Sequence, residues 1–416
     1  MSDQQSSHAE LLAQFAEHLA KERYSAVLVK RYLAVAAKFL CYLKKRAILV
    51  ESTQPSHVTM YVTCELKRFG RNHGHEPIIF ASWRASHTSG INHFLRFVIG
   101  TWPPSDSAAC ACDAFAQILT EFAQWLREVR GLAAETTGDL IAEAKRFLTW
   151  YAERTHADSL SKMTVADIDD YLRFRAPSLR RVTRKSVSQR LRCFMCFAHA
   201  TGRTARNFTS CVLAPTIYTD EGIPSVLRPD EISAVLNTTS KDGSPKGLRD
   251  YAILTILSTY GLRAGEVTCL RLDDIDWRAG TVLVRHTKTN AQTVLPLLPA
   301  IGEALLAYLQ ARPKTDAREI FIRACAPYQG FSSGSSLYSV IRDRLEEAGV
   351  RPVGKRGPHT FRHARAVSLL RAAVSPKIIG DLLGHRSSLS TRPYLKLATA
   401  DLRAVALEIP GWENHS

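Results

Sequence analysis

The first half of the chain carries one pattern of aromatic and aliphatic residues twice. Segments 15–19, 38–43 and 94–98 are echoed by segments 122–126, 146–151 and 194–198. In each copy the apolar residues recur at spacings of three and four, which predicts about four amphipathic helices. We therefore expect two helical bundles of roughly 100 residues each, the size of a small domain. Two unrelated bundles that share only generic periodicity are the alternative.

Two breaker-rich junctions divide the sequence into three expected domains. The first junction contains Gly100, Pro103 and Pro104, and the second extends from 213 to 224. Beyond it the pattern becomes mixed: one helix is expected to begin at Pro229, another to end at Gly261, and a β-hairpin to join 281–285 to 293–297. The predicted fold is mainly α with a small β-sheet. Its domains span 1–102, 107–215 and 224–412.

The charge balance predicts a polyanionic partner. The 416 residues include 55 Lys and Arg against 39 Asp and Glu, giving a net charge of +16. Such an excess favours nucleic acid first and an anionic membrane surface second. We expect no membrane association, because no stretch approaches the ~18 apolar residues of a spanning helix and the start lacks a signal-peptide pattern. Nine cysteines without framework spacing fit a reducing compartment, and we expect a cytoplasmic protein.

A basic stretch in the second copy is the candidate contact with phosphates. Eight cations fall within residues 173–192, and this stretch has no matching acids. Arginine and lysine side chains in such a cluster suit backbone contacts that hold nucleic acid without reading its bases. A solvated surface is the alternative. The predicted DNA-binding residues are Arg173, Arg175, Arg180, Arg181, Arg184, Lys185 and Arg190.

The last third of the chain collects the residue types needed to break and remake a phosphodiester. Arginine donates two bonds to phosphate oxygens and stays charged, histidine transfers protons, and tyrosine can attack phosphorus. Arg263 is expected at the start of a helix, where backbone N–H groups favour an anion. Arg362 should share a helix face with His359. The constellation is Arg263, His359, Arg362, His385 and Tyr394, the tyrosine nine residues after the histidine.

These motifs, in this order, resemble the catalytic domain of the tyrosine recombinases, also called phage-type integrases. The likeness extends from about 225 to 408 and includes 261–266, Lys288, 359–363, 382–385 and Tyr394. The preceding helical copy is similar to the family's core-binding domain, which clamps DNA. The resemblance therefore implies SAM-like helical DNA-binding modules followed by a mixed α+β catalytic domain.

The resemblance also assigns roles to the matched residues. Tyr394 would attack the scissile phosphate and form a 3′-phosphotyrosyl link. Arg263 and Arg362 would hold the non-bridging oxygens, and Lys288 would protonate the leaving 5′ oxygen. His359 would assist proton transfer to or from the tyrosine, and His385 would bond the phosphate. Outside this set, Glu266 is expected to fix the arginine helix, while Tyr328 and Tyr338 lie too early in the chain to replace Tyr394.

No metal or cofactor is expected. Cys193, Cys196 and His199 have the spacing of zinc ligands, but a fourth ligand is missing from the pattern, and buried core cysteines are the favoured interpretation. The sequence contains neither a Gly-rich nucleotide loop nor a carboxylate cluster for magnesium. This fits chemistry whose bond energy is kept in the phosphotyrosine.

The leading functional hypothesis is site-specific recombination of double-stranded DNA by a mobile-element integrase or transposase. The resemblance implies a homotetramer on two DNA sites, formed alone or with other recombinases. Segment 398–407 would be a helix that docks on a neighbouring protomer, with packing on its own domain as the alternative. Two other functions stay open: a type IB-like topoisomerase, which relaxes DNA as a monomer, and a catalytically inactive DNA-binding accessory protein.

Overall fold

The computed structural model describes residues 3–104, 113–217, 226–286, 291–352 and 354–384. Contacts divide the chain into two compact units, one of Met1–Trp102 with Gly222–Ser416 and the other of Pro103–Glu221. Both boundaries fall in the predicted junctions. The assignment of 1–102 and 224–412 to separate domains stays a prediction.

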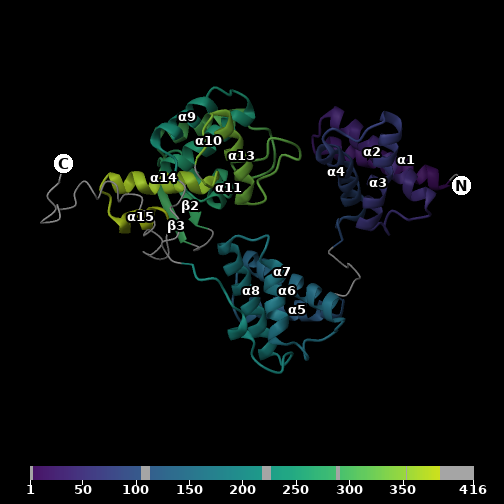
Figure 1. Ribbon diagram of the computed structural model, residues 1–416. Helices are drawn as coiled ribbons and strands as arrows, with labels where there is room; N and C mark the ends of the chain where they lie inside the picture. The colour runs from purple at the N-terminus through teal and green to yellow at the C-terminus, as the bar shows by residue number, and fades with distance from the viewer. Residues whose placement is uncertain (1–2, 105–112, 218–225, 287–290, 353, 385–416) are drawn as a thin grey trace, which may run out of the picture. The chain divides into compact units, whose positions relative to one another are not determined.

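Each half of the predicted repeat forms a bundle of four helices with its own apolar core (Figure 1). Ser25 begins the second helix by accepting a hydrogen bond from the Leu28 N–H. The first bundle contains α1 (Asp3–Lys21), α2 (Ala26–Lys45), α3 (Pro55–His73) and α4 (Phe80–Ile99). The second contains α5 (Asp113–Glu128), α6 (Ala134–Thr155), α7 (Val165–Arg175) and α8 (Arg181–Ala200), followed by a short turn of 3₁₀-helix, Thr209–Cys211.

The two bundles repeat the same ring contacts in their cores. In the first, Phe15 meets Phe94 edge-on with ring centroids 5.4 Å apart at 75°. In the second, Phe122 meets Phe194 edge-on at 5.3 Å and 78°. A further edge-on pair joins the second and third helices of each bundle, at 5.3 Å in the first and 5.1 Å in the second. Matching contacts at matching places favour a duplicated bundle over two unrelated ones.

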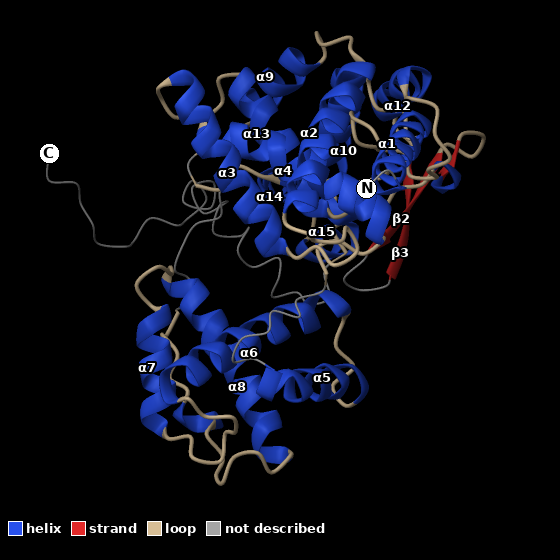
Figure 2. Ribbon diagram, turned by 90° about the vertical axis from the view of Figure 1, so that its right-hand side faces the viewer, coloured by secondary structure: helices blue, strands red, loops and turns tan. Residues whose placement is uncertain are grey.

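The C-terminal part combines helices with a three-stranded antiparallel sheet in the order β1-β2-β3. Figure 2 shows β2 and β3 side by side. The predicted hairpin is confirmed: β2 pairs with β3 so that Val284 faces Thr293 and His286 faces Ala291. The strands are β1 (Ile275–Asp276), β2 (Thr281–His286) and β3 (Ala291–Pro296). The helices are α9 (Pro229–Thr239), α10 (Pro245–Tyr260), α11 (Ala264–Thr268), α12 (Pro299–Ala311), α13 (Leu337–Glu347), α14 (Pro358–Arg371) and α15 (Pro376–Leu382), with 3₁₀ turns at Leu272–Asp274 and Gly334–Ser336.

Helix α10 forms the centre of this part. Its residues Ala252, Ile253, Leu254 and Leu257 are fully buried in the largest apolar core, and it contacts α9, α12 and α14. Residues 252–257 are buried in succession, which explains why the apolar residues of this stretch are not confined to one stripe of the helix. The predicted fold class, mainly α with a small sheet, is confirmed.

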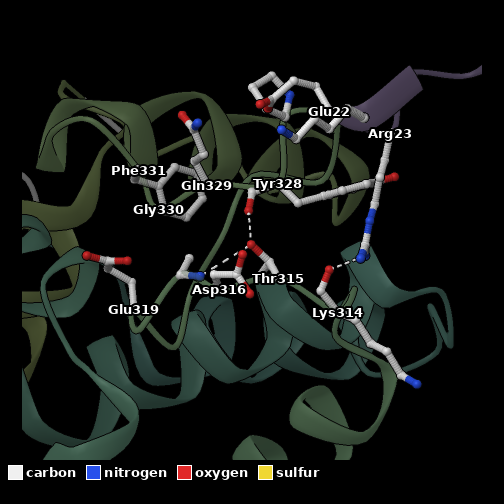
Figure 3. Close-up of a pocket in the computed structure, with 13 residues that line it drawn as sticks. Glu22, Arg23, Lys314, Thr315, Asp316, Glu319, Tyr328, Gln329, Gly330 and Phe331 are labelled. Atoms are coloured by element: carbon white, nitrogen blue, oxygen red, sulfur yellow. Dashed lines mark hydrogen bonds between the residues drawn. The ribbon is translucent and has the colours of Figure 1, made fainter. Parts of the chain in front are cut away.

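The segment between α12 and α13 has little regular structure and is held by side chain to backbone hydrogen bonds. The Arg312 guanidinium donates to the carbonyls of Ala317, Glu319 and Ile320. The Thr315 hydroxyl points toward Tyr328 and donates to its carbonyl at 2.7 Å (Figure 3). These bonds satisfy carbonyls that lack a strand or helix partner.

Among the residues that the structure describes, no helix is both long and apolar enough to span a bilayer.

Candidate active site

Arg263 lies where α10 stops and α11 starts. The left-handed conformation of Gly261, with φ of 69°, ends α10. Arg263 is the N-cap of α11, and the side chain of Glu266 accepts its backbone N–H at 2.7 Å. The predicted helix end and helix start are both confirmed. The Glu266 carboxylate already accepts this N–H, so Arg263 can offer a phosphate only its guanidinium group.

The Arg263 side chain is fixed at two points. Its Nη1 donates to Glu266 Oε1 at 2.7 Å, and its Nη2 donates to the carbonyl of Gly384 at 3.0 Å. Glu266 is fully buried while Arg263 keeps 17% of its side-chain surface exposed. Burial alone would raise the pKa of the Glu266 carboxyl, but bonds from the Arg263 backbone, His286 and the Arg263 side chain hold it below its usual value. Glu266 is therefore an anion that orients the Arg263 side chain. Its bond to the Arg263 N–H also caps α11, in line with the prediction that it fixes the arginine helix.

Arg362 reaches the same place from α14. Its side chain is buried, with Nη1 donating to the Gly261 carbonyl at 3.0 Å and Nη2 to the Leu383 carbonyl at 2.5 Å. One guanidinium thus joins the end of α10 to the end of α15. Among the described parts of the chain, this is where α10, α14 and α15 are tied together by side-chain bonds.

The two arginines converge on the turn directly before His385. Arg362 holds the carbonyl of Leu383 and Arg263 holds that of Gly384. The chain must pass very close to its neighbours here: a Cβ on Gly384 would lie 2.6 Å from Nδ1 of His286, and one on Gly261 would lie 2.9 Å from the Leu383 side chain. Both residues also have positive φ, so glycine suits each position.

His359 and His363 form a pair on the first turns of α14. Their ring centroids lie 6.1 Å apart with planes at 29°, and His359 is exposed whereas His363 is half-buried. Burial, followed by the nearby charges of His359, Arg362 and Lys355, lowers the pKa of His363 to about 4. The His363 ring is therefore neutral at neutral pH. His359 and Arg362 do lie on one helix, but the arginine turns into the protein and the histidine toward solvent.

Three predicted site residues, Lys288, His385 and Tyr394, lie outside the described residues. The structure nevertheless describes Gly384, directly before His385, and the two strands that flank the connection containing Lys288. Lys288 falls in the connection between β2 and β3, and His385 follows Gly384 directly.

The expectation that the basic stretch lacks acids is wrong in three dimensions. Arg173 bonds Asp170 at 3.2 Å, Arg190 pairs with Asp139, and Arg175 bonds both oxygens of Glu143 at 3.3 Å. Asp170 lies in the middle of α7, and Asp139 and Glu143 lie on α6. They are missed by a local reading because two of them lie more than thirty residues away in sequence.

The remaining cations of this stretch lie around the start of α8. Arg180, Arg181 and Arg184 are exposed, and Lys185 is partly exposed. Arg184 donates to the Leu179 carbonyl at 2.9 Å, which fixes part of its stem. The first turn of α8 carries no acid. The positive end of the helix dipole and several cations therefore lie together, and both favour an anion such as phosphate.

The cysteine and histidine triplet on α8 has no metal-like geometry. Cys193 packs beside the core of the second bundle, Cys196 is partly buried and His199 is exposed. Within the described residues no group of three or more His, Cys, Asp or Glu side chains could hold a metal ion.

Comparison with known proteins places this site in a family. A family model described as the phage integrase family matches residues 225–401. The putative integrase/recombinase y4rA of Sinorhizobium fredii (strain NBRC 101917 / NGR234) is 30% identical over 400 residues, covering 95% of this chain and 93% of its own length. The chain belongs to the phage integrase family of tyrosine recombinases. It is a tyrosine-type site-specific recombinase.

Two further relatives show how far the likeness reaches. The putative integrase/recombinase y4gC of the same organism is 61% identical over 192 residues, which cover 46% of this chain and 98% of that protein. The crystal structure of a lambda integrase (75-356) dimer bound to a COC′ core site shares the fold with a TM-score of 0.53 at 18% identity, covering 71% of this chain and 99% of that one. The recombinase fold therefore extends beyond the catalytic domain into the helical region before it.

One polar residue of this recombinase was missed by the sequence reasoning. His286, the last residue of β2, is buried and bonds Glu266. An isolated histidine in a strand gives no signal of its own, because a core histidine and a site histidine look the same in sequence.

Proposed function

We propose that this recombinase cleaves and rejoins double-stranded DNA through a 3′-phosphotyrosyl intermediate on Tyr394, without metal or ATP. One observation carries the proposal. Arg263 and Arg362, from helices about a hundred residues apart, are anchored on consecutive carbonyls directly before His385. Two guanidinium groups at one turn form a site for a phosphate, with bonds that pre-orient them before DNA arrives.

The proposed reaction assigns one task to each residue. The Tyr394 oxygen attacks phosphorus while the bond to the 5′ oxygen breaks, and Lys288 gives that oxygen a proton. His359 accepts the phenol proton, and His385 bonds the phosphate. The charge that develops on the non-bridging oxygens is stabilised by the two arginines. Religation is the reverse, so the energy of the DNA bond is kept in the phosphotyrosine.

The proton on Tyr394 is the chemical obstacle. An ordinary phenol has a pKa of about 10 and is a weak nucleophile at neutral pH. Neighbouring cations favour the phenolate, because an opposite charge within about 4–6 Å stabilises the charged form. Arg263 and Arg362 supply such cations as well as holding the phosphate.

The grip on DNA is proposed to lie mainly at the start of α8. Arg180, Arg181 and Arg184 are exposed at that end of the helix, and Lys185 extends it. Farther from it, Arg173, Arg175 and Arg190 are engaged with acids of α6 and α7. Phosphate binding by Arg175 would require breaking its contact with a buried carboxylate, so we assign it to the support of α7.

The biological reaction is proposed to be cytoplasmic and to serve a mobile element. Lambda integrase forms a dimer on a COC′ core site and a tetramer on a Holliday junction in its crystal structures. For this recombinase we propose a homotetramer on two DNA sites. Two N-terminal bundles would give each protomer two places to contact its DNA.

The test is a covalent adduct between protein and DNA. The substrate is a duplex from the DNA flanking the gene, nicked so that the cleaved end diffuses away and the adduct accumulates. Wild-type protein should form the adduct in EDTA without ATP, and Tyr394→Phe should abolish it. Tyr338→Phe is the matched control, since Tyr338 is an exposed tyrosine on α13 of the same domain, and it should retain the adduct.

The other outcomes separate the competing functions. An adduct that persists in Tyr394→Phe would overturn the choice of nucleophile. Relaxation of supercoiled plasmid without a partner site would favour a topoisomerase. Binding without any adduct in the wild type would favour a DNA-binding accessory protein.

A further inference from the structure

His286 is a buried histidine at the centre of the described site. Its side chain is only 1% exposed, although a histidine carries two polar nitrogens that must be satisfied when buried. It ends β2, on the strand that leads to the connection containing Lys288. None of the roles assigned so far uses it.

Both ring nitrogens have hydrogen-bond partners. Nδ1 lies 2.8 Å from Glu266 Oε1, and Nε2 lies 2.9 Å from the hydroxyl of Thr293. A carboxylate only accepts, so the proton is on Nδ1, and in the neutral ring Nε2 accepts from Thr293. Thr293 reaches the ring from β3, diagonally across the hairpin, since His286 faces Ala291. The ring is therefore held in one orientation.

This ring contacts both groups that hold the Arg263 guanidinium. Glu266 Oε1 receives Arg263 Nη1 at 2.7 Å and His286 Nδ1 at 2.8 Å. The same ring lies against Gly384, where a Cβ would come within 2.6 Å of Nδ1, and the Gly384 carbonyl receives Arg263 Nη2. Removal of the imidazole would deprive Glu266 Oε1 of a donor and open space beside Gly384, whose carbonyl is the second partner of Arg263.

We propose that His286 is a positioning residue that aims Arg263 at the scissile phosphate. It acts through Glu266 and the backbone of Gly384 and does not touch the DNA. The inference rests on the proposed function, in which Arg263 neutralises a non-bridging oxygen. His286 makes the hairpin part of the site. Because its ring is held by Thr293 of β3 and in turn holds Glu266, the orientation of Arg263 depends on the pairing of β2 with β3.

Two amide substitutions separate the bonds of the ring. His286→Asn places a side-chain N–H near the position of Nδ1, which keeps the bond to Glu266, whereas the longer amide of His286→Gln reaches toward Thr293 instead. The loss of one donor to a buried carboxylate corresponds to roughly a 10- to 150-fold slower cleavage step. We therefore expect His286→Leu and His286→Gln to lose about that much and His286→Asn to stay close to the wild type.

The deciding measurement is single-turnover cleavage of two substrates that differ at the scissile phosphate. One carries the ordinary phosphodiester, and the other carries a methylphosphonate, in which a methyl group replaces a charged oxygen; both diastereomers are assayed. If His286 acts by aiming Arg263, the defect of His286→Leu should shrink on the neutral substrate, as it should for Arg263→Ala. A defect caused by general loss of structure would be equal on both substrates.

Val284→Ala is the matched control for lost packing. Val284 is buried two residues earlier on the same face of β2. This variant should unfold more readily yet show the same ratio of rates on the two substrates as the wild type. Equal defects of His286→Leu on both substrates, or full activity of His286→Leu on the phosphodiester, would overturn the inference. Failure of the proposed function would look different, because Arg263→Ala would then cleave the phosphodiester normally.

Discussion

Tyr171 and Tyr61 occupy matching places in the two helical bundles and differ by one hydrogen bond. The Tyr171 hydroxyl donates to the buried Glu143 carboxylate at 2.6 Å, whereas the buried Tyr61 hydroxyl has no partner among the described residues. Their ring packing is nearly the same, with Phe147 at 5.1 Å and 84° and Phe39 at 5.3 Å and 78°. Substitution of each tyrosine by phenylalanine therefore tests the bond with the packing held constant.

The structure sets the size of the expected difference. A hydrogen bond to a charged group contributes about 1.5–3 kcal/mol. Glu143 keeps Arg175 at 3.3 Å and Arg146 at 3.1 Å, so the carboxylate is not left without donors. We expect Tyr171→Phe to destabilise the second bundle by about 1.5–3 kcal/mol at neutral pH. Tyr61→Phe should leave the first bundle unchanged or slightly more stable, because it removes a buried hydroxyl that lacks a partner.

The effect of Tyr171→Phe should also depend on pH. Burial raises the pKa of the Glu143 carboxyl, but the bonds from Tyr171 and Arg175 outweigh it and leave the pKa below its usual value. A carboxyl with a lowered pKa stabilises the fold above its unfolded-state pKa and loses that contribution as the pH falls through its folded-state pKa. The variant lacks part of this contribution. The difference between wild type and variant should therefore shrink below about pH 4.

Amide hydrogen exchange is the suitable assay, because a chain of several bundles has no single two-state midpoint. Peptides from α6 and α7 in Tyr171→Phe should exchange roughly 10- to 150-fold faster at neutral pH. Peptides from α2 and α3 in Tyr61→Phe should exchange at the wild-type rate or slightly more slowly. Equal changes in the two variants would refute the reasoning, and so would a Tyr171→Phe effect that does not vary with pH.

Two further predictions concern the turn before His385 and the DNA grip. Gly384→Ala should lower the free energy of unfolding by about 1 kcal/mol because of its positive φ and by about 1–3 kcal/mol more because of overpacking against His286. It should also abolish adduct formation. Gly349 also has a positive φ but has open space around it. Gly349→Ala should therefore lose only the roughly 1 kcal/mol of stability due to φ, measured by hydrogen exchange, and keep full activity. Equal losses of stability in the two variants would contradict the close packing of Gly384 against His286. Replacing Arg180 and Arg181 together by alanine should lower the slope of log binding constant against log salt by about two on non-specific duplex. Lys162→Ala, an exposed cation in the loop before α7, should leave that slope unchanged, and an unchanged slope in the double variant would remove the start of α8 from the DNA contact.

The helix boundaries on either side of Arg263 could be predicted because motif and local structure agree there. The end of α10 at Gly261 and the start of α11 at Arg263 both follow from local signals, namely a glycine with positive φ and an acid at the third helical position. The hairpin follows from alternation around a short polar turn. Each of these features is decided within a few residues of the chain, which is the range over which sequence patterns are informative.

Pairing between distant side chains could not be predicted in the same way. Glu143 precedes Arg175 by 32 positions, and Glu266 precedes His286 by 20. Which acid meets which cation depends on how helices and strands pack, and a single sequence does not carry that information. The basic stretch therefore looked unopposed, and the sequence pattern did not single out His286.

The charged contacts of the second bundle give a physical reason to place the main DNA grip there. Phe147 of α6 matches Phe39 of α2, and four positions earlier α6 has Glu143 where α2 has Val35. Tyr171 of α7 matches Tyr61 of α3, and four positions later α7 has Arg175 where α3 has Glu65. Glu143 bonds both Tyr171 and Arg175, the last residue of α7. The end of α7 is thus fixed directly before the loop that leads to Arg180. The first bundle has Val35 and Glu65 at these two places and so has no equivalent bond, and we propose that it contributes less to DNA binding than the second bundle.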